Sequence, residues 1–229
     1  MKKRLTRFLP FLLAFTIALP SYSVFAEEEN QAKETQTNKT NETQADETTA
    51  NDTLSLAAET AVLIDAASGE ILYDKDADKK MYPASITKLM TILLALENGK
   101  LTDEITFSHD AVYNIEPGSA HIAILEGETL TLEQVLRAII LRSANEASNG
   151  VAEYVDGSVE AFAKHMTERA KELGCTNTNF VNANGLFDEN HYTTAHDMAL
   201  IARELLKHEE YRSMMSETDY EIPPTNLQT

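Results

Sequence analysis

The sequence has 229 residues, with 19 lysines and arginines against 37 aspartates and glutamates, which gives a net charge of −18. This negative charge argues against nucleic acid and against anionic membrane surfaces as partners. The single cysteine, Cys175, excludes an internal disulfide framework and a cysteine zinc cluster, and we expect it to be a small buried residue rather than a nucleophile.

The first 26 residues have the three parts of a secretory signal peptide. A basic "MKKRLTR" precedes an apolar "FLPFLLAFTIALP", and the small-residue cleavage site "VFA" follows. The apolar run is short for a membrane span, and a retained N-terminal anchor is the alternative interpretation. We therefore predict an exported, extracytoplasmic protein. Cleavage removes four basic residues and no acidic ones, so the mature net charge is 15 − 37 = −22.

Residues 27–53 are rich in Glu, Thr, Asn and Gln and contain no aliphatic residue larger than alanine. Such a composition cannot offset the entropy lost on ordering, so we predict a disordered acidic Thr/Asn-rich linker. Residues 54–229 have the composition of a globular domain and are long enough for one hydrophobic core.

This domain opens with a predicted β-hairpin over residues 60–78, with its turn at Ser68-Gly69. A helix is predicted within residues 81–100, with Pro83 near its start. Its apolar residues surround the axis, which indicates a buried helix. Residues 101–130 contain turn signals, and we expect them to be irregular.

The rest of the domain reads as mostly helical. Thr131 and Gln134 form a capping-box pattern, and Thr194 with Asp197 is a second helix-start signal. The predicted helices cover residues 132–144, 145–155, 158–173 and 197–208. The polar stretch "TNTNFVNANGLFDENHYT" should form a loop, which we expect to lie near a cleft that opens at the start of the buried helix.

Ser85 and Lys88 lie at the start of the predicted buried helix. Helix positions three apart share a face, so the two side chains can meet. A lysine whose pKa is lowered by burial can serve as the base that a serine nucleophile needs, and the nearby helix N-terminus favours a developing oxyanion. Alone the S-x-x-K pattern is a weak signal, because an ordinary surface serine and lysine match it equally well.

A second polar pair, Ser143 and Asn145, lies in "RSANEASNG", directly after an apolar helical segment. In an extended or looped stretch these alternate residues point the same way, so both could face one cleft. There a hydroxyl could relay a proton, and an amide could hold a substrate peptide. The alternative is a helix cap, because Ser and Asn are both favoured N-cap residues.

Five stretches then occur in one order: "PASITKLMT", "PGS", "LRSANEASNGVAEYVDGS", "NTNFVNANGLFDENHYTTAHDMALIA" and "IPPTN". In them the chain resembles the serine D-alanyl-D-alanine carboxypeptidases, the low-molecular-mass penicillin-binding proteins, from about Ala57 to Thr229. The resemblance implies an α/β (α+β type) fold like that of β-lactamases and transpeptidases, here the N-terminal hairpin with the helical subdomain.

The resemblance also implies roles for the four residues. Ser85 would be the acylated nucleophile and Lys88 its proton acceptor, Ser143 would shuttle the proton, and Asn145 would bind the substrate peptide. The implied reaction removes the terminal D-alanine from peptidoglycan stem peptides at the cell wall or the outer face of the cytoplasmic membrane. β-Lactams would be inhibitors, and no metal or organic cofactor is implied.

The family's Lys-Thr-Gly motif is not found in this sequence. We therefore expect an incomplete catalytic domain without the C-terminal strands, and membrane association only through a tail beyond Thr229. A catalytically impaired peptidoglycan-binding fragment and a β-lactamase are the alternatives. The spacing of His191, His196 and Asp197 matches no standard zinc pattern, so we expect no metal site there.

Overall fold

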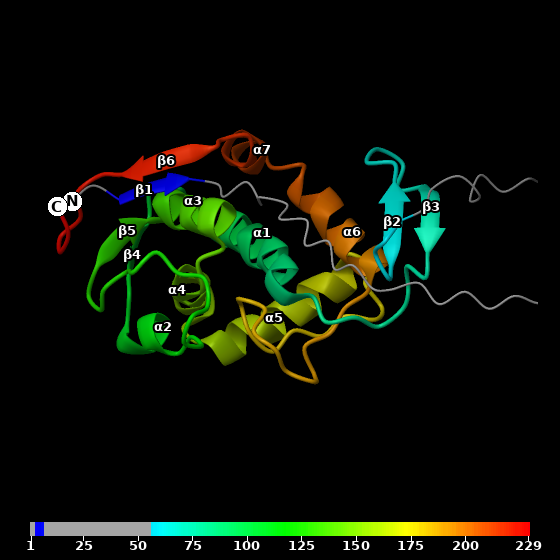
Figure 1. Ribbon diagram of the computed structural model, residues 1–229, viewed down its shortest axis with the longest axis horizontal. Coiled ribbons are helices and arrows are strands. Elements are labelled where there is room, and N and C mark those ends of the chain that lie inside the picture. The colour runs from blue at the N-terminus through cyan, green and yellow to red at the C-terminus, as the bar shows by residue number, and fades with distance from the viewer. Residues whose placement is uncertain (1–2, 7–55) are drawn as a thin grey trace, which may run out of the picture.

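The computed structural model describes residues 3–6 and 56–229 (Figure 1). The predicted linker, residues 27–53, and most of the predicted signal peptide lie outside the described residues. Within the signal-peptide segment, strand β1 (Lys3–Thr6) pairs antiparallel with strand β6 (Asp219–Ile222). The signal peptide and the linker both stay predictions.

The predicted hairpin is confirmed by strands β2 (Ala61–Ile64) and β3 (Ile71–Lys75), which pair antiparallel. Its turn closes because the Asp65 carboxylate accepts hydrogen bonds from the backbone N–H groups of Ala67 and Ser68. Gly69 then takes a φ of +82°, a left-handed conformation that glycine adopts at little cost. In Figure 1 this hairpin lies at the opposite end of the domain from β4 and β5.

Seven α-helices form the body of the described chain. Their bounds are α1 (Lys88–Asn98), α2 (His109–Tyr113), α3 (Leu132–Arg142), α4 (Asn145–Asp156), α5 (Val159–Glu172), α6 (Ala195–Leu205) and α7 (Glu209–Met215). Helix α1 contacts α3, α4, α5 and α6. Most of its apolar side chains are therefore buried, as its sequence predicts, and only Leu89 and Leu96 are partly exposed.

Two helix starts agree with the sequence prediction in atomic detail. At α3 the Thr131 hydroxyl accepts from the Gln134 backbone N–H, and the Gln134 side chain accepts from the Thr131 backbone N–H. At α6 the Thr194 hydroxyl accepts from the Asp197 backbone N–H. Each cap satisfies donors that a helix start would otherwise leave without a partner.

The prediction that residues 101–130 are irregular is correct for most of the region, including its turns, but it missed three short elements. This region contains α2 and two short antiparallel strands, β4 (Glu104–Thr106) and β5 (Thr129–Thr131). The Ser108 hydroxyl caps α2 by accepting from the Ala111 backbone N–H. Elements this short show no clear hydrophobic period in the sequence, and pairing with a distant partner stabilises them. Helix α7 and strand β6 were likewise not predicted.

Within residues 3–6 and 56–229, none of the helices has both the length and the apolar character that crossing a membrane requires.

Candidate active site

Ser85 lies in a 3₁₀ turn, η2 (Ala84–Thr87), and Lys88 is the first residue of α1. The predicted α-helical geometry is therefore wrong for the first turn. The predicted contact nevertheless forms, because residues three apart are eclipsed in a 3₁₀ helix. Lys88 Nζ donates a hydrogen bond to Ser85 Oγ over 3.1 Å.

The Lys88 ammonium is enclosed by neutral acceptors. Only 4% of the residue is exposed, and Nζ also donates to Asn145 Oδ1 at 2.7 Å and to the Asn184 backbone carbonyl at 2.6 Å. Burial lowers the pKa of Lys88 to about 8, and the negative charge of Glu146 opposes this shift. Near neutral pH a useful fraction of Lys88 is therefore neutral and able to accept the Ser85 proton.

The second predicted pair lies at the connection between α3 and α4. Ser143 takes a left-handed conformation (φ 55°, ψ 34°), Ala144 is extended, and α4 begins at Asn145. The N-cap position of α4 is Ala144, which makes no side-chain cap, so neither Ser143 nor Asn145 is an N-cap; Ser143 is instead the C-cap residue of α3. Asn145 reaches Lys88, whereas the buried Ser143 Oγ has no hydrogen-bond partner among the described residues.

The polar loop over residues 176–193 packs against η2, which we call the serine turn because it contains Ser85. We predicted that this loop lies near a cleft at the start of the buried helix. The Asn182 side chain accepts from the backbone N–H groups of Asn184 and Gly185, at 3.3 and 2.7 Å, which turns the chain. Gly185 has a φ of +87°, and a Cβ added there would lie 1.9 Å from the Ala84 carbonyl oxygen. Only glycine lets this loop lie directly against the residue that precedes Ser85.

A buried histidine ties the same loop to the serine turn. His191 Nδ1 accepts from the Val181 backbone N–H at 3.2 Å, so Nε2 carries the proton and donates to Thr87 Oγ1 at 2.7 Å. Burial lowers the pKa of His191 to about 4, which keeps the ring neutral. Thr91 Oγ1 adds a bond to the Ala183 carbonyl at 2.6 Å, so the loop is held on both sides of Lys88.

The three residues weighed as metal ligands are engaged separately. His191 bonds to Thr87, His196 contacts Asp78 at 3.1 Å, and the Asp197 carboxylate accepts two bonds from the start of the polar loop. The described part of the chain holds no group of three His, Cys, Asp or Glu side chains placed to bind a metal.

Sequence reasoning missed three contributors to the site. Asn184 acts through its backbone carbonyl, which no side-chain pattern reveals, and Gly185 acts through the absence of a side chain. The "NG" pair does predict a turn, but it does not show what the turn packs against. Glu146 follows Asn145 and has 1% of its surface exposed, yet its charged side chain suggests an exposed position in the sequence.

The fold indicates the class of protein, together with the contact between Ser85 and Lys88, two residues that we call the serine–lysine turn. The chain has the penicillin-binding protein and transpeptidase fold, as its solved structural relatives show. Residues 43–226 match the sequence profile of the D-alanyl-D-alanine carboxypeptidases, peptidase family S11. The chain belongs to this family.

Two curated relatives are D-alanyl-D-alanine carboxypeptidases. DacF from Bacillus subtilis is 43% identical over 161 residues, which cover 68% of this chain and 41% of that protein. DacA from Haemophilus influenzae is 33% identical over 219 residues, which cover 93% of this chain and 51% of that protein. The chain therefore spans about half or less of the length of these relatives.

The structural comparison gives the same family. The crystal structure of penicillin binding protein 5 from Haemophilus influenzae superposes with a TM-score of 0.68 at 31% identity, over 74% of this chain and 53% of that one. The carboxypeptidase DacD from Francisella tularensis gives a TM-score of 0.65 at 32% identity, over 71% of this chain and 40% of that one.

Proposed function

We propose that this chain is a serine peptidase that removes the terminal D-alanine from peptides ending in D-Ala-D-Ala, through an acyl-enzyme on Ser85. The observation that carries the proposal is the 3.1 Å contact between Ser85 Oγ and the buried Lys88 Nζ. Membership of the carboxypeptidase family supports the choice of reaction. Residues 54–229 would form the part of the catalytic domain that contains Ser85 and Lys88.

In the first step neutral Lys88 accepts the Ser85 hydroxyl proton while Oγ attacks the carbonyl carbon of the penultimate residue. The resulting oxyanion would lie near the Ser85 backbone N–H, which is in the first turn of η2, where N–H groups have no intrahelical acceptor. In this proposal the nucleophile, its base and one oxyanion donor all come from the four consecutive residues 85–88.

In the second step the tetrahedral intermediate collapses and breaks the peptide bond. The departing D-alanine nitrogen takes a proton, which we assign to Lys88 with Ser143 Oγ as the relay. The Ser143 hydroxyl suits this role because it is buried and has no hydrogen-bond partner among the described residues. Water then attacks the ester while Lys88 takes one of its protons; the bond between the acyl carbon and Ser85 Oγ breaks, the shortened peptide leaves as its carboxylic acid, and Lys88 returns the proton to Ser85 Oγ.

We assign substrate positioning to Asn145. Its Oδ1 accepts the Lys88 hydrogen bond, so the amide is oriented and its Nδ2 group remains to donate to a substrate carbonyl. One side chain would thereby couple the position of the peptide to the position of the base.

The biological setting follows from the same family membership. We infer that the natural substrates are peptidoglycan stem peptides, that β-lactams acylate Ser85, and that the protein acts outside the cytoplasmic membrane. The predicted signal peptide over residues 1–26 supports export.

The decisive experiment is the intact mass of the 229-residue chain after incubation with benzylpenicillin, beside a Ser85→Ala variant. We expect a covalent penicilloyl adduct on the wild type and none on the variant. Circular dichroism establishes that both proteins are folded. A folded wild-type chain that forms no adduct would refute acyl transfer and leave a peptidoglycan-binding function instead.

A further inference from the structure

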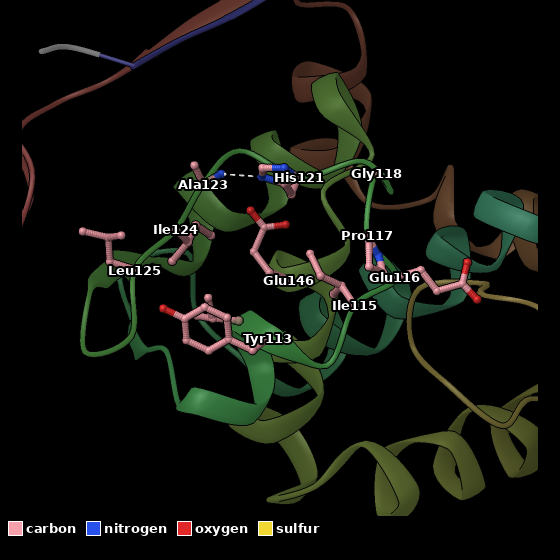
Figure 2. A pocket seen from close by; sticks show the side chains of 11 residues that line it. Tyr113, Ile115, Glu116, Pro117, Gly118, His121, Ala123, Ile124, Leu125 and Glu146 are labelled. Carbon is pink, nitrogen blue, oxygen red and sulfur yellow. Dashed lines mark hydrogen bonds between the residues drawn. The ribbon is translucent and has the colours of Figure 1, made fainter.

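A cavity of about 360 Å³ opens between α2, the segment 114–125 and the first turn of α4 (Figure 2). This volume lies in the range of small-molecule sites. Most of its wall is apolar and comes from Val112, Tyr113, Ile115, Ile124 and Leu125. Tyr113 and Leu125 are 57% and 43% exposed, so the cavity is open to solvent on their side.

The Glu146 carboxylate lies among these apolar side chains, as Figure 2 shows. Its Oε1 accepts a hydrogen bond from the Ile122 backbone N–H at 2.6 Å. Its Oε2 is buried and has no hydrogen-bond partner among the described residues. A buried carboxylate oxygen without a donor is costly, so this atom marks a place where a partner is missing.

No lysine or arginine is among the described residues that line the cavity. The other ionisable side chains there are Tyr113, Glu116 and His121, and His121 Nδ1 accepts from the Ala123 backbone N–H. The cavity therefore combines a negative floor with apolar walls. This combination disfavours an anion and favours a cation attached to a hydrocarbon chain.

We propose that this cavity binds an alkylammonium group, whose N–H donates to Glu146 Oε2 and whose hydrocarbon chain packs against Ile115 and Ile124. A charge-assisted hydrogen bond would satisfy the buried oxygen, and the methylene groups would bury apolar surface. The cavity adjoins the turn that carries Ser85 and Lys88, because the charge of Glu146 acts on Lys88, but the proposal does not depend on acyl transfer at Ser85.

The first test compares pentylammonium with 1-pentanol as probes of the ¹⁵N-labelled 229-residue chain by NMR. The amide of Ile122 reports directly on Glu146, because it donates to the same carboxylate. We expect saturable shifts of the Ile122 and Ala123 amides with pentylammonium, and binding of the neutral alcohol weaker by about tenfold or more. Equal binding of the two probes would overturn the proposal, and so would amine shifts confined to residues 84–88.

The second test uses two isosteric variants. Glu146→Gln removes the charge and keeps an acceptor for the Ile122 N–H, and we expect it to weaken pentylammonium binding by about tenfold or more. Glu116→Gln removes a carboxylate of the same cavity and should leave the affinity within about twofold. Unchanged binding by Glu146→Gln, or an equal loss in both variants, would contradict the assignment.

Discussion

The two regions that meet at Asn145 and Glu146 differ in how their buried polar groups are satisfied. On one side, the serine turn and the loop over residues 176–193 form a closed network in which Lys88, Thr87 and Thr91 all have partners. On the other side, three buried polar atoms have no hydrogen-bond partner among the described residues. They lie in the segment 114–125, in the α3–α4 connection and at the start of α4. They are Ser119 Oγ, Ser143 Oγ and Glu146 Oε2.

This difference shows which parts of the site are already assembled. A partnered network holds a lysine with a lowered pKa in one position before any substrate arrives. An unpartnered buried polar group costs about 1–3 kcal/mol, so it is expected where another molecule completes the bonding. We interpret the first region as a preformed base and the second as a surface that receives ligands.

The substitution Lys88→Arg should have the largest effect on the rate of acylation, because it changes the residue that we interpret as the preformed base. Arginine keeps the positive charge but cannot lose its proton, so it cannot act as the base. We expect acylation of Ser85 by a fluorescent penicillin to slow by about 10²–10⁴-fold. Lys80→Arg, at an exposed position, is the matched control and should acylate at the wild-type rate. Near-normal acylation by the Lys88→Arg protein would remove Lys88 from the role of base.

Gly185→Ala tests the close packing of the loop against the serine turn. The new Cβ would lie 1.9 Å from the Ala84 carbonyl oxygen, so we expect unfolding in urea to show a loss of about 3 kcal/mol. Gly157→Ala is the control, because Gly157 also has a positive φ but no atom within 4 Å of an added Cβ. Its cost should be about 1 kcal/mol. Equal losses would show that conformation matters here and close packing does not.

His191 should make the stability of the network depend on pH. Burial holds the folded pKa at about 4, below the ordinary 6.5, so the unfolded chain binds a proton first as pH falls. The stabilisation is complete above pH 6.5 and decreases between pH 6.5 and pH 4, with about 2 kcal/mol lost from pH 7 to pH 5. Urea unfolding at the two pH values measures it. His191→Gln should show a correspondingly smaller difference, and an unchanged one would contradict this origin.

The smallest effect links the two regions through charge. The Glu146 carboxylate raises the pKa of Lys88, against the larger effect of burial. We expect the rate of penicillin acylation to rise with pH and level off above about 8 in the wild type. In Glu146→Gln the midpoint should move to lower pH, by less than about one unit. A midpoint that moves to higher pH, or does not move, would show that this charge does not act on Lys88.

The contacts that could be predicted from the sequence are local. Ser85 and Lys88 are three residues apart, so either an α or a 3₁₀ turn brings them together. The caps of α3 and α6 likewise use hydrogen bonds between residues three apart. The hairpin was recognisable because its turn residues and both apolar runs lie within one short stretch.

Only the tertiary structure decided which distant groups surround Lys88. The Asn184 carbonyl is 96 residues away in the chain, and its position depends on how the whole 176–193 loop folds onto α1. Ser143 has a left-handed backbone that its sequence does not predict, and its hydroxyl has no hydrogen-bond partner among the described residues, whereas Asn145 contacts Lys88. Sequence by itself indicated the candidate nucleophile, its candidate base and five of the seven helices in the described residues. Long-range packing determined the desolvation that lowers the pKa of Lys88, because burial belongs to the folded chain as a whole.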